Sequence, residues 1–144
     1  MKNIIVAIDF ENNQHLVLDQ ALIFGKTFNA KLWLLHIAAP DPDFVGMEAG
    51  PQTERDNRAA QLRKEHRLLE DYTREISNKG VAAEGLLIQG TTTETIIEKA
   101  KTLKADLIIK GHHEHGFIYK ALIGSVSNQI IKRTKIPVLI VPLD

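Results

Sequence analysis

The sequence predicts a doubly wound α/β fold, in which helices cover both faces of a five-stranded parallel sheet. Five apolar runs rich in β-branched residues recur along the chain and do not alternate strictly with polar residues, as expected for strands buried on both faces. They span residues 4–8, 32–37, 86–88, 107–109 and 138–141. Segments of helical period separate them, and this alternation favours right-handed crossovers within one parallel sheet.

Four helices are expected between these strands, because apolar residues recur there every three or four positions. The four stripes are Val17, Ala21, Phe24 and Phe28; Leu62, Leu69, Tyr72 and Ile76; Ile96 or Ile97 with Ala100 and Leu103; and Val126, Ile130 and Thr134. Thr91 followed by Glu94 forms a capping box, which predicts that the third helix begins just after Gly90. Pro137 fits the start of the last strand, where it breaks no ladder.

One irregular stretch interrupts the alternation, from residue 38 to about residue 57. It contains Pro40, Pro42, Gly46, Gly50 and Pro51. Because most connections have about 4–6 residues, we expect either a mobile flap or a disordered tip here, and the sequence leaves open whether it closes over a site. No repeat, low-complexity tract or dividing linker occurs, which predicts a single domain over residues 1–144.

The composition excludes several classes of function. Eighteen Lys and Arg balance eighteen Asp and Glu, so no overall field attracts nucleic acid or an anionic membrane. No run approaches the roughly 20 apolar residues of a membrane span, and Asp9 comes too early for the apolar region of a signal peptide. The chain has no cysteine, which excludes disulfides, thiol nucleophiles and cysteine zinc sites. We therefore expect a cytoplasmic protein.

Ligands of open parallel sheets bind beyond the carboxyl ends of the strands, where the strand order reverses. The two most polar strand ends are residues 9–13 after the first strand and residues 111–116 after the fourth, which carry three histidines. Asp9 either faces a ligand or caps the first helix. Gly124 and Ser125 precede the last helix, where free N–H groups attract an anion, but they also fit a simple turn and N-cap. The standard phosphate-loop patterns are absent.

Several of these segments together resemble the universal stress protein family. Residues 4–9 resemble the family's first strand ending in aspartate, and residues 34–37 its second strand. Residues 105–111 resemble the strand that enters its phosphate loop, while residues 124–126 and 137–141 resemble its closing segment. The resemblance covers essentially the whole chain outside residues 38–57. It implies the adenine nucleotide alpha hydrolase-like fold with strand order 3-2-1-4-5.

The resemblance also implies a binding site for ATP, alone or with Mg²⁺. ATP-binding members carry G-x-x-G, nine residues and then G-[ST], whose backbone holds the phosphates. In this sequence Gly111 matches the first glycine and Gly124 with Ser125 the last pair, while Asp9 would face the ribose and Ile37 the adenine. The expected binding residues are Ala7, Ile8, Asp9, Ile37, Gly111, His112, Glu114, Gly124, Ser125, Val126 and Ser127.

Glu114 departs from the family pattern, because it occupies the position of the second glycine. Two like charges about 4 Å apart repel by roughly 4 kcal/mol at an effective dielectric near 20, which would weaken binding about a thousandfold without compensation. Protonated His112, His113 or His115, or a bridging divalent ion, would compensate. Two hypotheses follow: an adenine nucleotide still binds, or the chain is a dimeric stress scaffold that binds no nucleotide.

The histidines allow a third hypothesis, a transition-metal site formed by His112, His113, Glu114 and His115. His36 lies within an apolar strand and is expected to be a core histidine. The G-x-S-x-G elbow of hydrolases is missing, and no residue stands out as a water-activating base apart from Glu114. We therefore expect a binding protein and no enzyme beyond slow ATP hydrolysis.

The last strand predicts a homodimer. Residues 136–141 are strongly apolar, and such a strand would be hazardous at an unpaired sheet edge. A two-fold partner would cover it, and the family resemblance implies the same pairing.

Two charged segments have structural explanations. The basic cluster at residues 132–135 ends the last helix, where cations interact favourably with the helix dipole. Residues 54–74 mix both charges as a solvated helix face does. Neither segment predicts a nucleic-acid or membrane partner.

Overall fold

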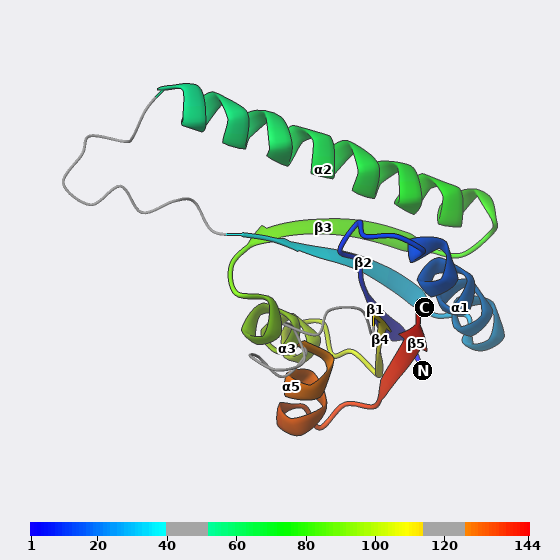
Figure 1. Cartoon of the computed structure of the whole chain (residues 1–144). Coiled ribbons are helices and arrows are strands. Elements are labelled where there is room, and N and C mark those ends of the chain that lie inside the picture. Colours follow the sequence, from blue (N-terminus) through cyan, green and yellow to red (C-terminus); the bar gives the residue numbers. More distant parts are fainter. Residues whose placement is uncertain (40–51, 114–125) are drawn as a thin grey trace.

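The computed structural model describes residues 1–39, 52–113 and 126–144. Within them, five parallel strands form one sheet in the order β3-β2-β1-β4-β5, which confirms the predicted class and strand order (Figure 1). The elements are β1 (Asn3–Ala7), α1 (Gln14–Phe28), β2 (Lys31–Ala38), α2 (Gln52–Asn78), β3 (Ala83–Gln89), α3 (Thr92–Thr102), β4 (Leu107–His112), α5 (Val126–Arg133) and β5 (Val138–Pro142).

Alternate residues of the central strands supply two apolar cores. Ile4 and Val6 pack with residues of α1 and α2, whereas Ile5 packs with residues of α3 and α5. All three side chains are fully buried, which explains why the sequence of β1 does not alternate between apolar and polar. Figure 1 shows the corresponding layers, with α2 on one side of the sheet and α3 and α5 on the other.

The second helix begins earlier than the sequence predicted. Helix α2 starts at Gln52, so the expectation of irregular chain to about residue 57 was wrong for residues 52–57. No apolar stripe marks this first turn, but polar side chains hold it together. Gln52 donates to Asp56 over 2.8 Å, and Arg55 donates to Gln52 over 2.7 Å. Ala38 is the last residue of β2, so the expectation was also wrong at that end. The remainder of the expected flap or tip, residues 40–51, lies outside the described residues.

The capping box has the predicted position but a different bonding pattern. Thr91 is the N-cap residue of α3, as expected. Its hydroxyl donates to the Glu94 carboxylate, and it makes no side-chain hydrogen bond to the backbone of the helix. Phe28 also differs from its predicted role, because it is 45% exposed and stacks on Phe24 instead of entering the core.

Replacing Leu69 by alanine should destabilise the fold by about 2–5 kcal/mol. Leu69 is 1% exposed and lies against Gly85 of β3, where an added Cβ would come within 3.1 Å of Leu69 Cγ. Its neighbour Leu68 is only partly buried, so Leu68→Ala is the matched control and should cost less than half as much. Urea denaturation of both variants measures the difference, and equal costs would contradict this account of α2 packing.

Candidate functional site

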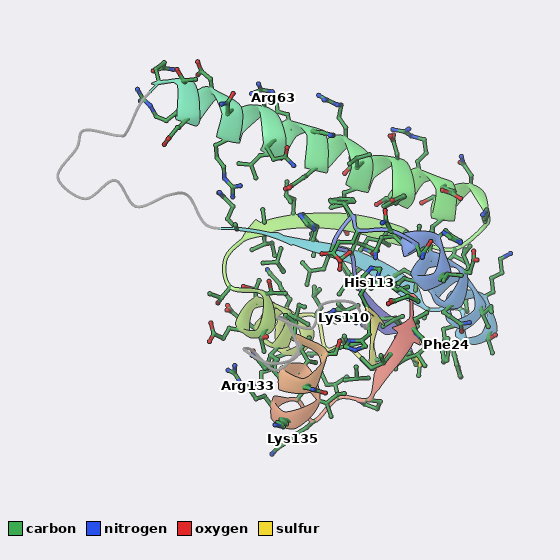
Figure 2. All side chains as sticks on the ribbon, in the orientation of Figure 1. Phe24, Arg63, Lys110, His113, Arg133 and Lys135 are labelled. Carbon is green, nitrogen blue, oxygen red and sulfur yellow. The ribbon has the colours of Figure 1, made fainter. Side chains whose placement is uncertain are left out.

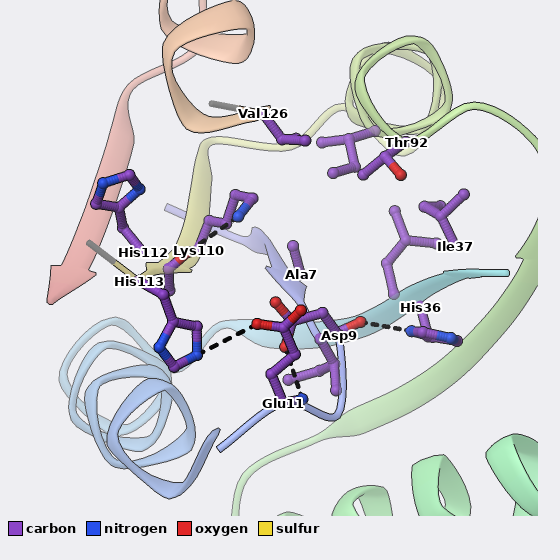
Figure 3. Close-up of a pocket in the computed structure, with 14 residues that line it drawn as sticks. Ala7, Asp9, Glu11, His36, Ile37, Thr92, Lys110, His112, His113 and Val126 are labelled. Carbon is purple, nitrogen blue, oxygen red and sulfur yellow. Dashed lines mark hydrogen bonds and ion pairs between the residues drawn. The ribbon is translucent and has the colours of Figure 1, made fainter. Parts of the chain in front are cut away.

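A pocket of about 340 Å³ opens beyond the carboxyl ends of β1 and β4. These two strands are neighbours in the sheet, yet the chain leaves them toward opposite faces, so the pocket lies at the switch point of the fold. Figure 3 shows side chains from the strand ends, α3 and α5 around this space. The lining residues are Ala7, Ile8, Asp9, Glu11, Leu35, His36, Ile37, Thr92, Ile96, Lys110, Gly111, His112, His113 and Val126.

Asp9 lines the pocket and does not cap the first helix. Its carboxylate accepts a hydrogen bond from the backbone N–H of Glu11 over 2.9 Å, which is a local Asx turn. The N-cap position of α1 belongs to Asn13, whose side chain makes no capping bond. The capping alternative for Asp9 was therefore wrong. The carboxylate keeps acceptor capacity for a further donor in the pocket.

The turn after β1 is held in an uncommon backbone conformation. Phe10 has a φ of 60°, a region that a bulky residue adopts only where its surroundings enforce it. Its ring lies 4.5 Å from the ring of His36 and 5.8 Å from that of Tyr72. This aromatic contact joins the turn to β2 and α2, and so it fixes the position of Asp9 at the rim of the pocket.

His36 is a satisfied core histidine, as the sequence predicted. It is 7% exposed, and Nδ1 lies 2.7 Å from the carbonyl oxygen of Ile8. A carbonyl only accepts, so Nδ1 carries the proton and donates it. Nε2 lies 3.3 Å from Oε2 of Glu65. The imidazole thus ties β2 to the end of β1 and to α2.

His113 joins three distant parts of the chain at the other wall of the pocket. Its Nδ1 lies 3.1 Å from Oδ1 of Asp144, and its Nε2 lies 3.5 Å from Oε2 of Glu11. Nearby, Asn13 donates to the carbonyl of Leu143 over 2.8 Å. The segment after β5 therefore lies against the turn after β1. Sequence reasoning missed Glu11 and Asp144, which no local pattern connects to His113 at a separation of 102 and 31 positions, respectively.

Lys110 is a further functional candidate that sequence reasoning missed. Its Nζ donates to the carbonyl of Gly111 over 2.9 Å. Burial lowers the pKa of Lys110, and the carboxylates of Asp9 and Glu11 offset part of this effect. Figure 2 shows the contrast with Arg63, which points from α2 into solvent, while Lys110 lies among the strands and helices.

Gly111 contributes only backbone to the pocket. A Cβ built on this residue would come within 2.5 Å of Leu143 Cδ1 and 2.9 Å of Val17 Cγ2. Both atoms belong to the core that packs with α1. A glycine is therefore required here by close packing behind the strand, independently of any ligand in front of it.

The structure brings most of the described predicted site residues together. Ser127 of α5 does not line the pocket; it is 3% exposed, and its hydroxyl lacks a hydrogen-bond partner among the described residues. Glu114, Gly124 and Ser125 lie outside the described residues. The predicted residues that line the pocket are Ala7, Ile8, Asp9, Ile37, Gly111, His112 and Val126.

The described half of the proposed metal cluster does not converge. Figure 3 shows His112 beside β5 and His113 directed at Glu11, as their neighbouring positions at a strand end require. Among residues 1–39, 52–113 and 126–144, no group of three or more His, Cys, Asp or Glu side chains is placed so that it could hold a metal ion. His115 and Glu114 lie outside these ranges.

Within the part of the chain that the structure describes, no helix has the length and apolarity that crossing a bilayer requires.

Sequence comparison assigns a family to this architecture. The model of the "Universal stress protein family" matches residues 1–142. The universal stress protein YxiE of Bacillus subtilis is 28% identical over 142 residues, which cover 95% of this chain and 96% of YxiE. A Thermus aquaticus universal stress protein is 29% identical over 142 residues, which cover 97% of this chain and 98% of the relative.

Solved structures share the fold. A universal stress protein in complex with cAMP superimposes with a TM-score of 0.74 at 22% identity, covering 99% of this chain and 98% of the other. An Arabidopsis thaliana universal stress protein family protein with AMP bound gives a TM-score of 0.71 at 20% identity, and the match covers 100% of this chain and 93% of the other. The Archaeoglobus fulgidus universal stress protein in complex with dAMP gives 0.65 at 17% identity, covering 97% of each chain.

The close packing behind Gly111 predicts that Gly111→Ala destabilises the fold by about 1–3 kcal/mol. The same substitution should cost less in a Leu143→Ala background, because the truncated side chain leaves room for the new methyl group. A double-mutant cycle by urea denaturation should therefore give non-additive costs. Strict additivity would show that Leu143 does not restrict position 111.

Proposed function

Because the chain belongs to the universal stress protein family, whose model it matches over residues 1–142, we propose that it binds an adenine nucleotide, first of all ATP with Mg²⁺. The site is the pocket between the ends of β1 and β4. Its location at the switch point of the sheet is the observation that carries the proposal, and its volume of about 340 Å³ lies within the range of small-molecule sites.

The chemistry of the lining fits the two halves of a nucleoside. Ile37, Ala7 and Ile96 line the pocket with apolar surface, which suits the faces of an adenine ring. Asp9 stands at the rim with unused acceptor capacity, and a carboxylate accepts readily from the vicinal hydroxyls of a ribose. We therefore assign Ile37 to the base and Asp9 to the sugar, as the family resemblance implies.

The phosphates would lie toward the start of α5. Val126, its first residue, lines the pocket, and the N–H groups at a helix N-terminus favour an anion. Gly124 and Ser125 directly precede this helix and would add backbone donors. Mg²⁺ would be carried mainly by the phosphates. The structural relatives are described with cAMP, AMP or dAMP, which supports an adenine nucleotide and leaves the number of phosphates to experiment.

We propose binding without efficient catalysis, in the cytoplasm where ATP is abundant. The carboxylates that line the pocket have structural partners, Asp9 in its turn and Glu11 beside His113. Neither is arranged as an isolated base for an attacking water. Multiple-turnover phosphate release should therefore stay below about one per second, which would be a modest enzymatic rate.

Titration calorimetry with ATP and Mg²⁺ tests the proposal directly, and Asp9 provides the specific variant. The parent should prefer ATP over 2′,3′-dideoxy-ATP by about tenfold or more, because hydrogen bonds to a charged acceptor contribute roughly 1.5–3 kcal/mol. Asp9→Ala should lose this preference, while the exposed control Asp19→Ala should retain it. The absence of any heat from the parent at millimolar ATP would contradict the proposal.

Glu114→Gly distinguishes the proposal from the alternative of a dimeric scaffold that binds no nucleotide. If the glutamate weakens phosphate binding, the variant should bind ATP more tightly than the parent. Binding by the variant alone would favour the scaffold. Equal binding by both proteins would show that the like-charge objection was wrong.

We also propose a homodimer formed through the C-terminal strand. β5 lies at one edge of the sheet, and Val138, Leu139 and Ile140 are only partly buried. A second copy paired along this edge would cover them and satisfy the free backbone groups. Light scattering at micromolar concentration should give about twice the chain mass of 16.1 kDa. A mass equal to that of one chain would contradict the dimer.

A further inference from the structure

Lys110 is the one lysine or arginine among the described residues that line the pocket. Along β4, Ile109 and Gly111 face the core beside α1, whereas Ile108 faces α3 and α5. Strand alternation therefore directs Lys110 to the same side as Ile108, where the pocket opens. Figure 3 shows the side chain extending from β4 on the side of Val126.

The side chain of Lys110 is partly withdrawn from water, and its ammonium group has no direct anionic partner among the described residues. It donates a 2.9 Å hydrogen bond to the Gly111 carbonyl, and no carboxylate of a described residue forms an ion pair with it. Even partial burial of a charge is unfavourable unless the charge is paired, and it accordingly lowers the pKa of this lysine. Two of its three donor positions remain for another acceptor.

The pocket also contains negative charge that would oppose an anionic ligand. Asp9 and Glu11 line it, and both act on Lys110 through space. A phosphate entering beside these carboxylates needs a cation at close range, because like charges repel strongly where water is excluded. Of the described lining residues, Lys110 is the one lysine or arginine, whose side chain is a cation in its ordinary protonation state. His112 and His113 are the titratable alternatives.

We propose that Lys110 binds a phosphate group of the ligand and makes the pocket selective for nucleotides over nucleosides. The inference rests on the proposed function and deepens it. The phosphate supplies the anionic partner that Lys110 lacks. In return, Lys110 neutralises part of the negative charge of the phosphate, which the carboxylates of Asp9 and Glu11 would otherwise repel. The site should therefore bind phosphorylated ligands more tightly than adenosine, and this difference should depend on the Lys110 side chain.

Titration calorimetry of four proteins with adenosine, AMP and ATP tests the inference. The parent should bind AMP and ATP more tightly than adenosine. Lys110→Met should weaken the binding of AMP and ATP by about 10–100-fold, which is the range expected for a charge-assisted hydrogen bond. The same variant should change the affinity for adenosine by less than about twofold. Lys110→Arg retains the charge and should preserve the preference for phosphates. The exposed control Lys79→Met should match the parent.

Thermal unfolding of the ligand-free proteins separates ligand recognition from a structural role. Lys110→Met should unfold at the parent's temperature or above, because an apolar side chain replaces a partly buried, unpaired charge. If Lys110→Met binds ATP as the parent does, the inference is wrong and the proposed function stands. If it loses adenosine and ATP equally, or unfolds at lower temperature, Lys110 has a structural role instead. If the parent binds none of the three compounds, the proposed function itself fails, and the inference fails with it.

Discussion

Strand β1 pairs in parallel with both β2 and β4, and this pairing determines where polar side chains can stand in the sheet. Ile4 is in register with Leu32 on one side and with Leu107 on the other, and β1 is buried on both faces. No polar group can be accommodated along such a strand without a partner. Polar side chains are therefore confined to the strand ends, and the divergence of the chain after β1 and β4 leaves the pocket between them.

Contacts between distant segments give this pocket a defined shape. Phe10, in its strained conformation, packs on His36 and Tyr72 and joins the turn after β1 to α2. On the other wall, His113 lies between Glu11 and Asp144. Each contact is modest in energy, but both act on the short segment that carries Asp9. A ligand would therefore meet a carboxylate whose position is already fixed, which reduces the entropic cost of binding.

The arrangement of elements was predictable from the sequence because burial on both faces leaves a strong local pattern. The same reasoning placed His36 in the core and Asp9 beyond the first strand. It failed where contacts arise between segments far apart in sequence. No pattern near Glu11 indicates a contact with His113. Lys110 follows an apolar run, and nothing in that run indicates that its side chain enters a pocket. The start of α2 was missed because polar pairs, and no apolar stripe, stabilise its first turn.

We propose that the Asp9 carboxylate after β1 and the partly buried Lys110 of β4 together enclose an adenine nucleotide. A crystal structure of the protein grown with ATP and Mg²⁺ tests it most directly. We expect nucleotide density in the pocket, with the ribose at Asp9, the base against Ile37 and a phosphate oxygen within hydrogen-bond distance of Lys110 Nζ. Nucleotide bound elsewhere, or a pocket occupied by the protein's own side chains at saturating ATP, would contradict it.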